Sequence, residues 1–240
     1  MKLFFLAITL LFSTTLYATL PIGIVSLCKG NIKLKHKNSI VKKKVQTGTK
    51  IQEGDLISST LKSAAKIKLI DGSVVVLDQS SSIYFKSLSQ AEQKSGTILY
   101  RITSRDAKNA LKIKTPFAII GIKGTTFIVN ATDNASVSLK EGLLGINSLH
   151  QEFYLYRKKL EDEFAAFKAQ GDKHIKKQKE EFERYKQQQS EYKKVEIVKS
   201  FDLKAGNKIS FEGRDVKEKS FSKSEDSEFQ HFYKLLNTMQ

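Results

Sequence analysis

The chain has 240 residues, and 40% of them are hydrophobic, enough to bury a core in one large domain or two small ones. Its 41 Lys+Arg against 25 Asp+Glu give a formal net charge of +16, which points to anionic partners. The single cysteine, Cys28, excludes an intramolecular disulfide, so the fold must hold through packing alone.

The first 18 residues differ in character from the rest. Lys2 is followed by an apolar run from Leu3 to Phe12, and the small residue Ala18 lies where a signal peptidase would cut. The run is about half as long as a membrane-spanning helix requires. We therefore predict a secretory signal peptide over residues 1–18 and a periplasmic or otherwise exported protein with no integral membrane span after cleavage. The alternative is an uncleaved membrane anchor.

Residues 19–150 show short segments of period two between polar or glycine-bearing turns, a pattern typical of strands. One turn is expected at residues 29–31 and another at Gly54 and Asp55, and the clearest hairpin is joined at Asp71-Gly72. No helical pattern separates these segments. This region is therefore predicted to form an all-β sandwich or barrel.

The stretch TPFAIIGIKGTTFIV, residues 115–129, combines a core-like composition with a proline and two glycines. Pro116 cannot donate a ladder hydrogen bond, so we expect it at a strand start or edge. Gly121 and Gly124 predict a bulge or bend that lets FAII and TTFIV lie on different parts of the sandwich. The stretch contains no nucleophile, base or metal ligand in a catalytic pattern, so its predicted role is structural.

Six segments in this order resemble the FecR domain, the periplasmic module of ferric-citrate-type regulators: GNIKL, EGDLISS, AAKIKLIDGSVVVLDQSSSI, KSGTILYRI, KTPFAIIGIKGTTFIV and SLKEGLLGI. The resemblance covers about 130 residues and implies a FecR-like β-sandwich. The family usually carries arginine directly before the Gly-Thr pair, where this chain has Lys123, which would not reproduce a forked arginine contact. The residues that match the family motif are Thr115, Pro116, Gly121, Lys123, Gly124, Thr125 and Phe127.

Residues 151–194 change to alternating charge without proline, with apolar residues at steps of three, four or seven. This pattern predicts an inserted helical arm with a coiled-coil-like seam, either a hairpin turning near residues 170–172 or one long helix. A hairpin buries the seam within itself, whereas a single helix buries it against a partner or in a homodimer. The predicted contact surface comprises Phe153, Tyr156, Leu160, Phe164 and Phe167.

The remaining residues return to a strand pattern. FDLKAGNKISF resembles the last FecR strands, so residues 195–213 are predicted to rejoin the β domain, with a turn at residues 204–206. Residues 214–240 are predicted to form a polar linker and a short amphipathic helix. Four apolar residues of that helix are expected to dock: Phe229, Phe232, Leu236 and Met239.

Most of the positive charge lies in the β domain, where residues 22–150 hold 20 Lys+Arg against 8 Asp+Glu. Lysines alternate with apolar residues on three predicted strands, and side chains two apart share a sheet face. The candidate basic face comprises Lys33, Lys35, Lys66, Lys68, Lys112 and Lys114. It could bind anionic glycan or lipid head groups; alternatively, these lysines are ordinary solvent-side residues that block edge pairing. No stacking aromatic residues are interleaved with them, which argues against nucleic acid.

The sequence offers no candidate catalytic residue, cofactor site or metal site, because its four histidines are far apart and lack ligand spacing. In FecR-family regulators, the periplasmic domain is attached through a membrane helix to a cytoplasmic segment that controls a sigma factor. This chain shows neither a cytoplasmic segment nor a second hydrophobic span. We therefore predict an exported, non-enzymatic interaction or signalling module that contacts an envelope protein. The alternative is a β-sandwich that binds anionic glycan or lipid head groups.

Overall fold

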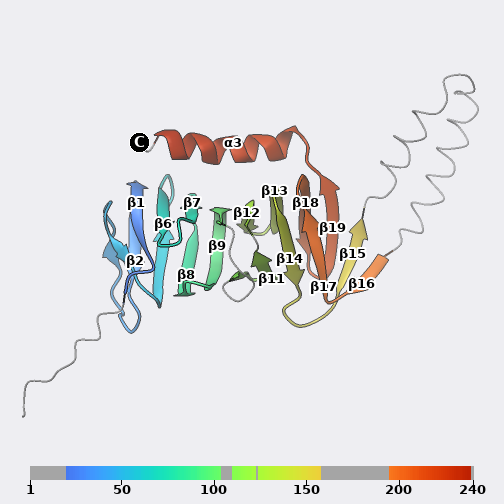
Figure 1. Ribbon diagram of the computed structural model, residues 1–240, viewed down its shortest axis with the longest axis horizontal. Coiled ribbons are helices and arrows are strands. Elements are labelled where there is room, and N and C mark those ends of the chain that lie inside the picture. Colours follow the sequence, from blue (N-terminus) through green and yellow to red (C-terminus); the bar gives the residue numbers. More distant parts are fainter. Residues whose placement is uncertain (1–19, 104–109, 123, 158–194, 239–240) are drawn as a thin grey trace, which may run out of the picture.

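The computed structural model describes residues 20–103, 110–122, 124–157 and 195–238. Within them, nineteen strands form two stacked sheets, followed by one helix, α3 (Lys223–Thr238) (Figure 1). The strands are β1 (Gly23–Lys29), β2 (Ile32–Lys35), β3 (Lys43–Lys44), β4 (Lys50–Ile51), β5 (Asp55–Ser59), β6 (Ala64–Leu69), β7 (Val74–Leu77), β8 (Ser82–Ser87), β9 (Gln90–Arg101), β10 (Leu111–Lys114), β11 (Ile119–Ile122), β12 (Thr126–Ala131), β13 (Ser136–Glu141), β14 (Leu143–Asn147), β15 (Phe153–Arg157), β16 (Val195–Val198), β17 (Ser200–Lys204), β18 (Asn207–Glu212) and β19 (Asp215–Ser220).

The two sheets share one long strand. Sheet A has the order β4-β1-β6-β7-β9-β12-β13-β18-β19-β15-β16. Sheet B has the order β3-β2-β5-β8-β9-β10-β11-β14-β17. The first half of β9 pairs with β8 in sheet B, and its second half pairs with β12 in sheet A. The strand changes sheets at Gly96, which has a φ of +79°.

The main core lies between the two sheets, and a second, smaller core lies between sheet A and α3. Strand β7 contributes to both: Val75 and Leu77 point into the sandwich, whereas Val74 and Val76 lie under the helix with Phe229 and Phe232. In Figure 1, α3 runs crosswise to the strands from the β18–β19 side toward β1. Sheet A is therefore covered on both faces over its central strands.

The mainly β fold and the C-terminal helix confirm the coarse prediction. The expected turns are also present, with positive φ at Gly30, Gly54, Gly72 and Gly206. At Gly72, the turn joins β6 to β7, and the Asp71 carboxylate accepts a hydrogen bond from the Ser73 amide. Local turn chemistry therefore predicted which consecutive strands are joined by tight turns.

The stretch 115–129 crosses between the sheets as predicted, because β11 belongs to sheet B and β12 to sheet A. Gly124 supplies the bend, with a φ of +62°. Gly121 does not: it lies inside β11 in regular register with Lys112 and Gly145. Pro116 lies in the turn between β10 and β11 rather than at a strand start or edge.

Two predicted boundaries are wrong. The helical arm was expected to begin at residue 151, but residues 153–157 form β15, because the alternating apolar residues Phe153 and Leu155 point into the core. The polar linker was expected from residue 214, but residues 215–220 form β19, which pairs with β18 and β15. The C-terminal helix correspondingly begins at residue 223.

Residues 158–194, which hold most of the predicted arm, lie outside the described residues, as do residues 1–19. The structure does place the two ends of the arm segment. Tyr156 pairs with Val195 across the antiparallel strands β15 and β16, so the chain leaves and re-enters the sheet at adjacent positions. Among the described residues, no helix is long and apolar enough to cross a membrane.

Candidate functional site

The six lysines of the predicted basic face lie on two opposite faces. Lys66 and Lys68 are on β6 and point outward from sheet A, whereas the lysines of β2 and β10 point outward from sheet B. The prediction of one shared face is therefore wrong, because residue parity within a strand does not say to which sheet the strand belongs.

The four lysines of sheet B form two separate groups. Lys33 and Lys35 lie near one edge, and Lys112 and Lys114 lie four strands away. Between them, Glu92 is in register with Lys114, and its carboxylate is 2.6 Å from the Lys94 ammonium. The β10 pair remains exposed and stands beside Gly121, which has no side chain.

The family-motif residues have structural roles. Thr115 is buried, and its hydroxyl donates to the Ala118 carbonyl and accepts from the Ala118 amide, both at 2.9 Å. Phe127 is buried and stacks on Tyr100 at 5.0 Å between ring centroids, while burial raises the pKa of the Tyr100 hydroxyl well above its ordinary value. Thr125 is buried at the sheet crossing, and Lys123 lies outside the described residues. These contacts hold the turn and the crossing in place.

Of the five predicted seam residues, the structure describes Phe153 and Tyr156. Phe153 is a core residue whose ring lies 6.0 Å from that of Phe201 and 5.8 Å from that of Phe211. Tyr156 is half-buried on β15. Leu160, Phe164 and Phe167 lie outside the described residues, so the prediction of a partner contact stands for them alone.

A concave pocket of about 500 Å³ opens at one end of the sandwich, and we call it the end pocket. Four connections between strands meet there, with Phe117, Asp133, His150 and Arg214 among the lining residues. Phe153 and Phe211 close its inner side. No sequence pattern predicts this pocket, because its residues come from segments almost 100 positions apart. Phe117, the aromatic residue after Thr115-Pro116, is the sequence feature that could have suggested an apolar site here.

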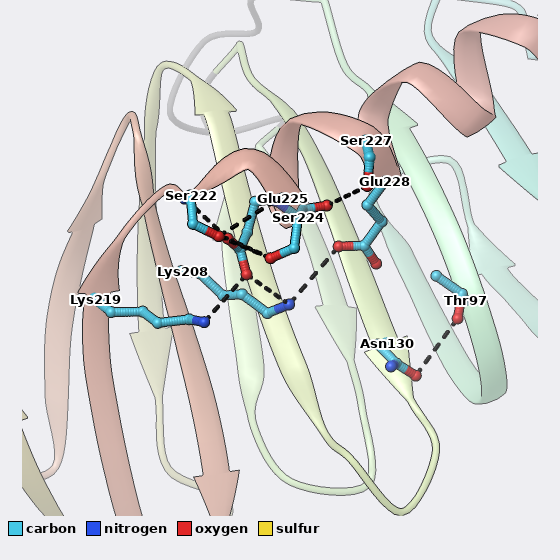
Figure 2. A network of polar contacts seen from close by, with 9 residues as sticks. All are labelled: Thr97, Asn130, Lys208, Lys219, Ser222, Ser224, Glu225, Ser227 and Glu228. Carbon is cyan, nitrogen blue, oxygen red and sulfur yellow. Dashed lines mark hydrogen bonds and ion pairs between the residues drawn. The ribbon is translucent and has the colours of Figure 1, made fainter.

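The N-terminus of α3 is anchored to sheet A by a polar network, shown in Figure 2. Ser222 precedes the helix, its amide donates to the Glu225 carboxylate at 2.9 Å, and its hydroxyl donates to the same carboxylate. The Ser224 amide donates to the Ser222 hydroxyl at 3.3 Å, so Ser222 is the N-cap of the helix. The other carboxylate oxygen lies 3.2 Å from the Lys219 ammonium and 3.4 Å from the Lys208 ammonium. Two strands thus hold the first turn of the helix.

Glu225 is 2% exposed, and burial alone would raise its pKa. Hydrogen bonds from the Ser222 side chain and amide, from Ser224 and from Lys219 outweigh that effect and hold the pKa well below its ordinary value of 4.5. The carboxylate is therefore charged at neutral pH and stabilises the docked helix.

Replacing Glu225 with glutamine is expected to lower the free energy of unfolding by about 2–3 kcal/mol at pH 7. The folded pKa is depressed, so this stabilisation is fully present above the ordinary value of 4.5 and is lost as the pH falls toward the folded pKa. Urea unfolding at pH 7 and pH 3 should therefore show a smaller difference between the two proteins at pH 3. Ser227→Ala is the control, with an expected change within about 0.5 kcal/mol. A difference that does not vary with pH would contradict this assignment.

The described histidines are dispersed. The His36 ring contacts the buried Asp55 carboxylate at 2.9 Å, the His231 ring contacts Asp78 at 3.0 Å, and His150 lines the end pocket. His174 lies outside the described residues. Over the part of the chain that the structure covers, no group of three or more His, Cys, Asp or Glu side chains could hold a metal ion.

The fold thus defines a two-sheet β domain with a helix strapped across one face. Residues 55–144, from β5 into β14, match the family model described as FecR protein. Two crystal structures of a candidate anti-sigma factor from Parabacteroides distasonis ATCC 8503 each align at 13% identity and a TM-score of 0.44. Each alignment covers 69% of this chain and 59% of the other. No curated protein matches the chain.

Proposed function

We propose that the protein is an exported, non-enzymatic module that acts in signalling or interaction through contact with an envelope protein. The match of residues 55–144 to the FecR family model carries this proposal. A domain of this family is associated with signal reception through protein contact, and the sequence offers no residue with an assigned chemical role. The signal-peptide pattern of residues 1–18 supports export.

The segment between β15 and β16 is the proposed contact element. Its apolar residues repeat at helical spacing, and its ends are fixed next to each other by the pairing of Tyr156 with Val195. A segment attached at two adjacent strands can be removed without separating strands that pair with each other. A single deletion variant can therefore remove the contact element and leave the β domain in place.

The test replaces residues 158–193 with Asn-Gly, a two-residue loop suited to continuing the register of β15 and β16. We expect the variant to keep the urea midpoint of the unaltered β domain and to lose recovery of its partner in a cross-linked pull-down from envelope fractions. Undiminished recovery would remove this segment from the mechanism. A homodimer through the segment would appear in the same experiment as recovery of a second copy of the chain.

The alternative proposal is that the sandwich binds anionic glycan or lipid head groups. It is favoured by the exposed lysines of sheet B, and the lysines of β6 on sheet A provide a matched control. Charge reversal at Lys112 and Lys114 is expected to weaken binding to anionic vesicles or an acidic polysaccharide by roughly tenfold, and binding should also fall as salt rises. Charge reversal at Lys66 and Lys68 should have less effect. Equal losses, or binding that ignores salt, would contradict a site on sheet B.

A further inference from the structure

We propose that the end pocket binds the C-terminal residue of a partner polypeptide, with an apolar side chain on the aromatic floor and the terminal carboxylate against Arg214. This inference rests on the proposed function, protein contact, and assigns it a place and a chemistry. The volume of about 500 Å³ falls within the range of about 300–1,000 Å³ typical of ligand sites.

The floor of the pocket is aromatic and held by packing. Phe117 is half-buried, and its ring lies 4.4 Å from the ring of Phe211, which in turn contacts Phe153. The turn that presents Phe117 is fixed by the buried Thr115 hydroxyl, which also accepts a hydrogen bond from the Phe117 amide at 3.3 Å. A preformed apolar floor favours a ligand with an apolar or aromatic side chain.

Arg214 is exposed at the rim, but other contacts orient it. Its Nε donates to the Glu152 carbonyl at 2.9 Å, and its guanidinium lies 4.4 Å from the centroid of the Tyr154 ring. These contacts use Nε and one face of the group, and Arg214 is among the residues that line the end pocket. A guanidinium oriented in this way suits a carboxylate, which it can bind through two parallel hydrogen bonds.

The other polar residues of the pocket limit the charge of the ligand. Asp133, in the turn between β12 and β13, is the acidic lining residue and would repel a second carboxylate. Gln151 and His150 can hydrogen-bond to the backbone of the ligand. The pocket therefore suits a ligand that has one carboxylate, an apolar side chain and a peptide group. The C-terminal residue of a polypeptide has all three.

The test is a titration of the ¹⁵N-labelled chain from residue 19 onward, followed by NMR. The probes are the hexapeptide Gly-Ser-Gly-Ser-Gly-Phe with a free carboxylate, the same peptide with a C-terminal amide, and the free-carboxylate peptide ending in alanine. We expect the first peptide to shift the amides of Phe117, Gln151 and Gly213. Amidation, the alanine end and Arg214→Gln should each weaken binding by roughly tenfold.

Lys217→Gln is the matched control, because it removes one exposed positive charge from the same hairpin outside the pocket. It should leave the affinity unchanged within about twofold. The proposal would be overturned by equal binding of the amidated peptide, by an equal loss in the Lys217 variant, or by shifts confined to other surfaces. Absence of shifts up to about 5 mM peptide would also overturn it. None of these results alters the pull-down expected for the 158–193 replacement, so the two proposals fail separately.

Discussion

Replacing Gly96 with alanine is expected to lower the free energy of unfolding by about 3–5 kcal/mol, one of the largest effects of a single substitution in this chain. Gly96 has a φ of +79°, where other residues are strained. An added Cβ would also lie 2.4 Å from the Ser81 Cα and 2.7 Å from the Ser80 carbonyl oxygen. The backbone of β9 would have to shift where it passes from sheet B to sheet A.

Gly206→Ala separates the two causes. Gly206 has the same φ of +79°, but no atom lies within 4 Å of an added Cβ. Only conformational strain should therefore act there, at a cost of about 1–2 kcal/mol. Urea unfolding of both variants measures the difference. Equal losses at the two positions would show that the close approach of Ser80 and Ser81 does not constrain the crossing.

Replacing Phe232 with alanine is expected to release α3 from sheet A and to cost about 3–5 kcal/mol in the transition that includes the helix. Phe232 and Phe229 are 1% exposed, and they cover Val74, Val76 and Leu99. Hydrogen exchange should show faster exchange along α3, while the strands of the inter-sheet core remain protected.

His231→Ala is the neighbouring control. The His231 ring is exposed, lies 3.0 Å from the Asp78 carboxylate and meets the Phe232 ring edge-on at 5.6 Å between centroids, so its loss should cost less than about 1 kcal/mol. If both substitutions left exchange in α3 unchanged, the aromatic contact would not be what holds the helix on the sheet.

Much of the sheet arrangement could be predicted from turn chemistry and alternation, as at Asp71-Gly72 and at the crossing after Gly124. The sequence also contains a feature that indicates a cover over sheet A, where α3 lies. Three central strands of sheet A contain continuous apolar runs instead of alternation, at Val74–Leu77, residues 98–100 and residues 127–129, and all of these residues are buried. A strand that is apolar on both faces must be covered on both faces.

Other features depended on tertiary placement that the sequence pattern does not contain. Phe153 and Tyr156 fit the helical repeat of the residues that follow them, yet pairing with β16 and β19 makes them part of a strand. The six lysines share a parity within their strands, but the strands belong to different sheets. The end pocket joins four connections, so no local motif marks it. In each case, the local sequence pattern is compatible with two structures, and a contact with a distant part of the chain determines which one forms.

The most direct test of protein contact is photo-cross-linking in the exporting cell, with a photoreactive amino acid placed at residue 160, 164 or 167 and, as a control, at Lys112. We predict a covalent adduct with another envelope protein from at least one of the three positions and none from residue 112. Adducts from none of the three positions would contradict the proposed contact element, and adducts only between two copies of this chain would replace it with self-assembly.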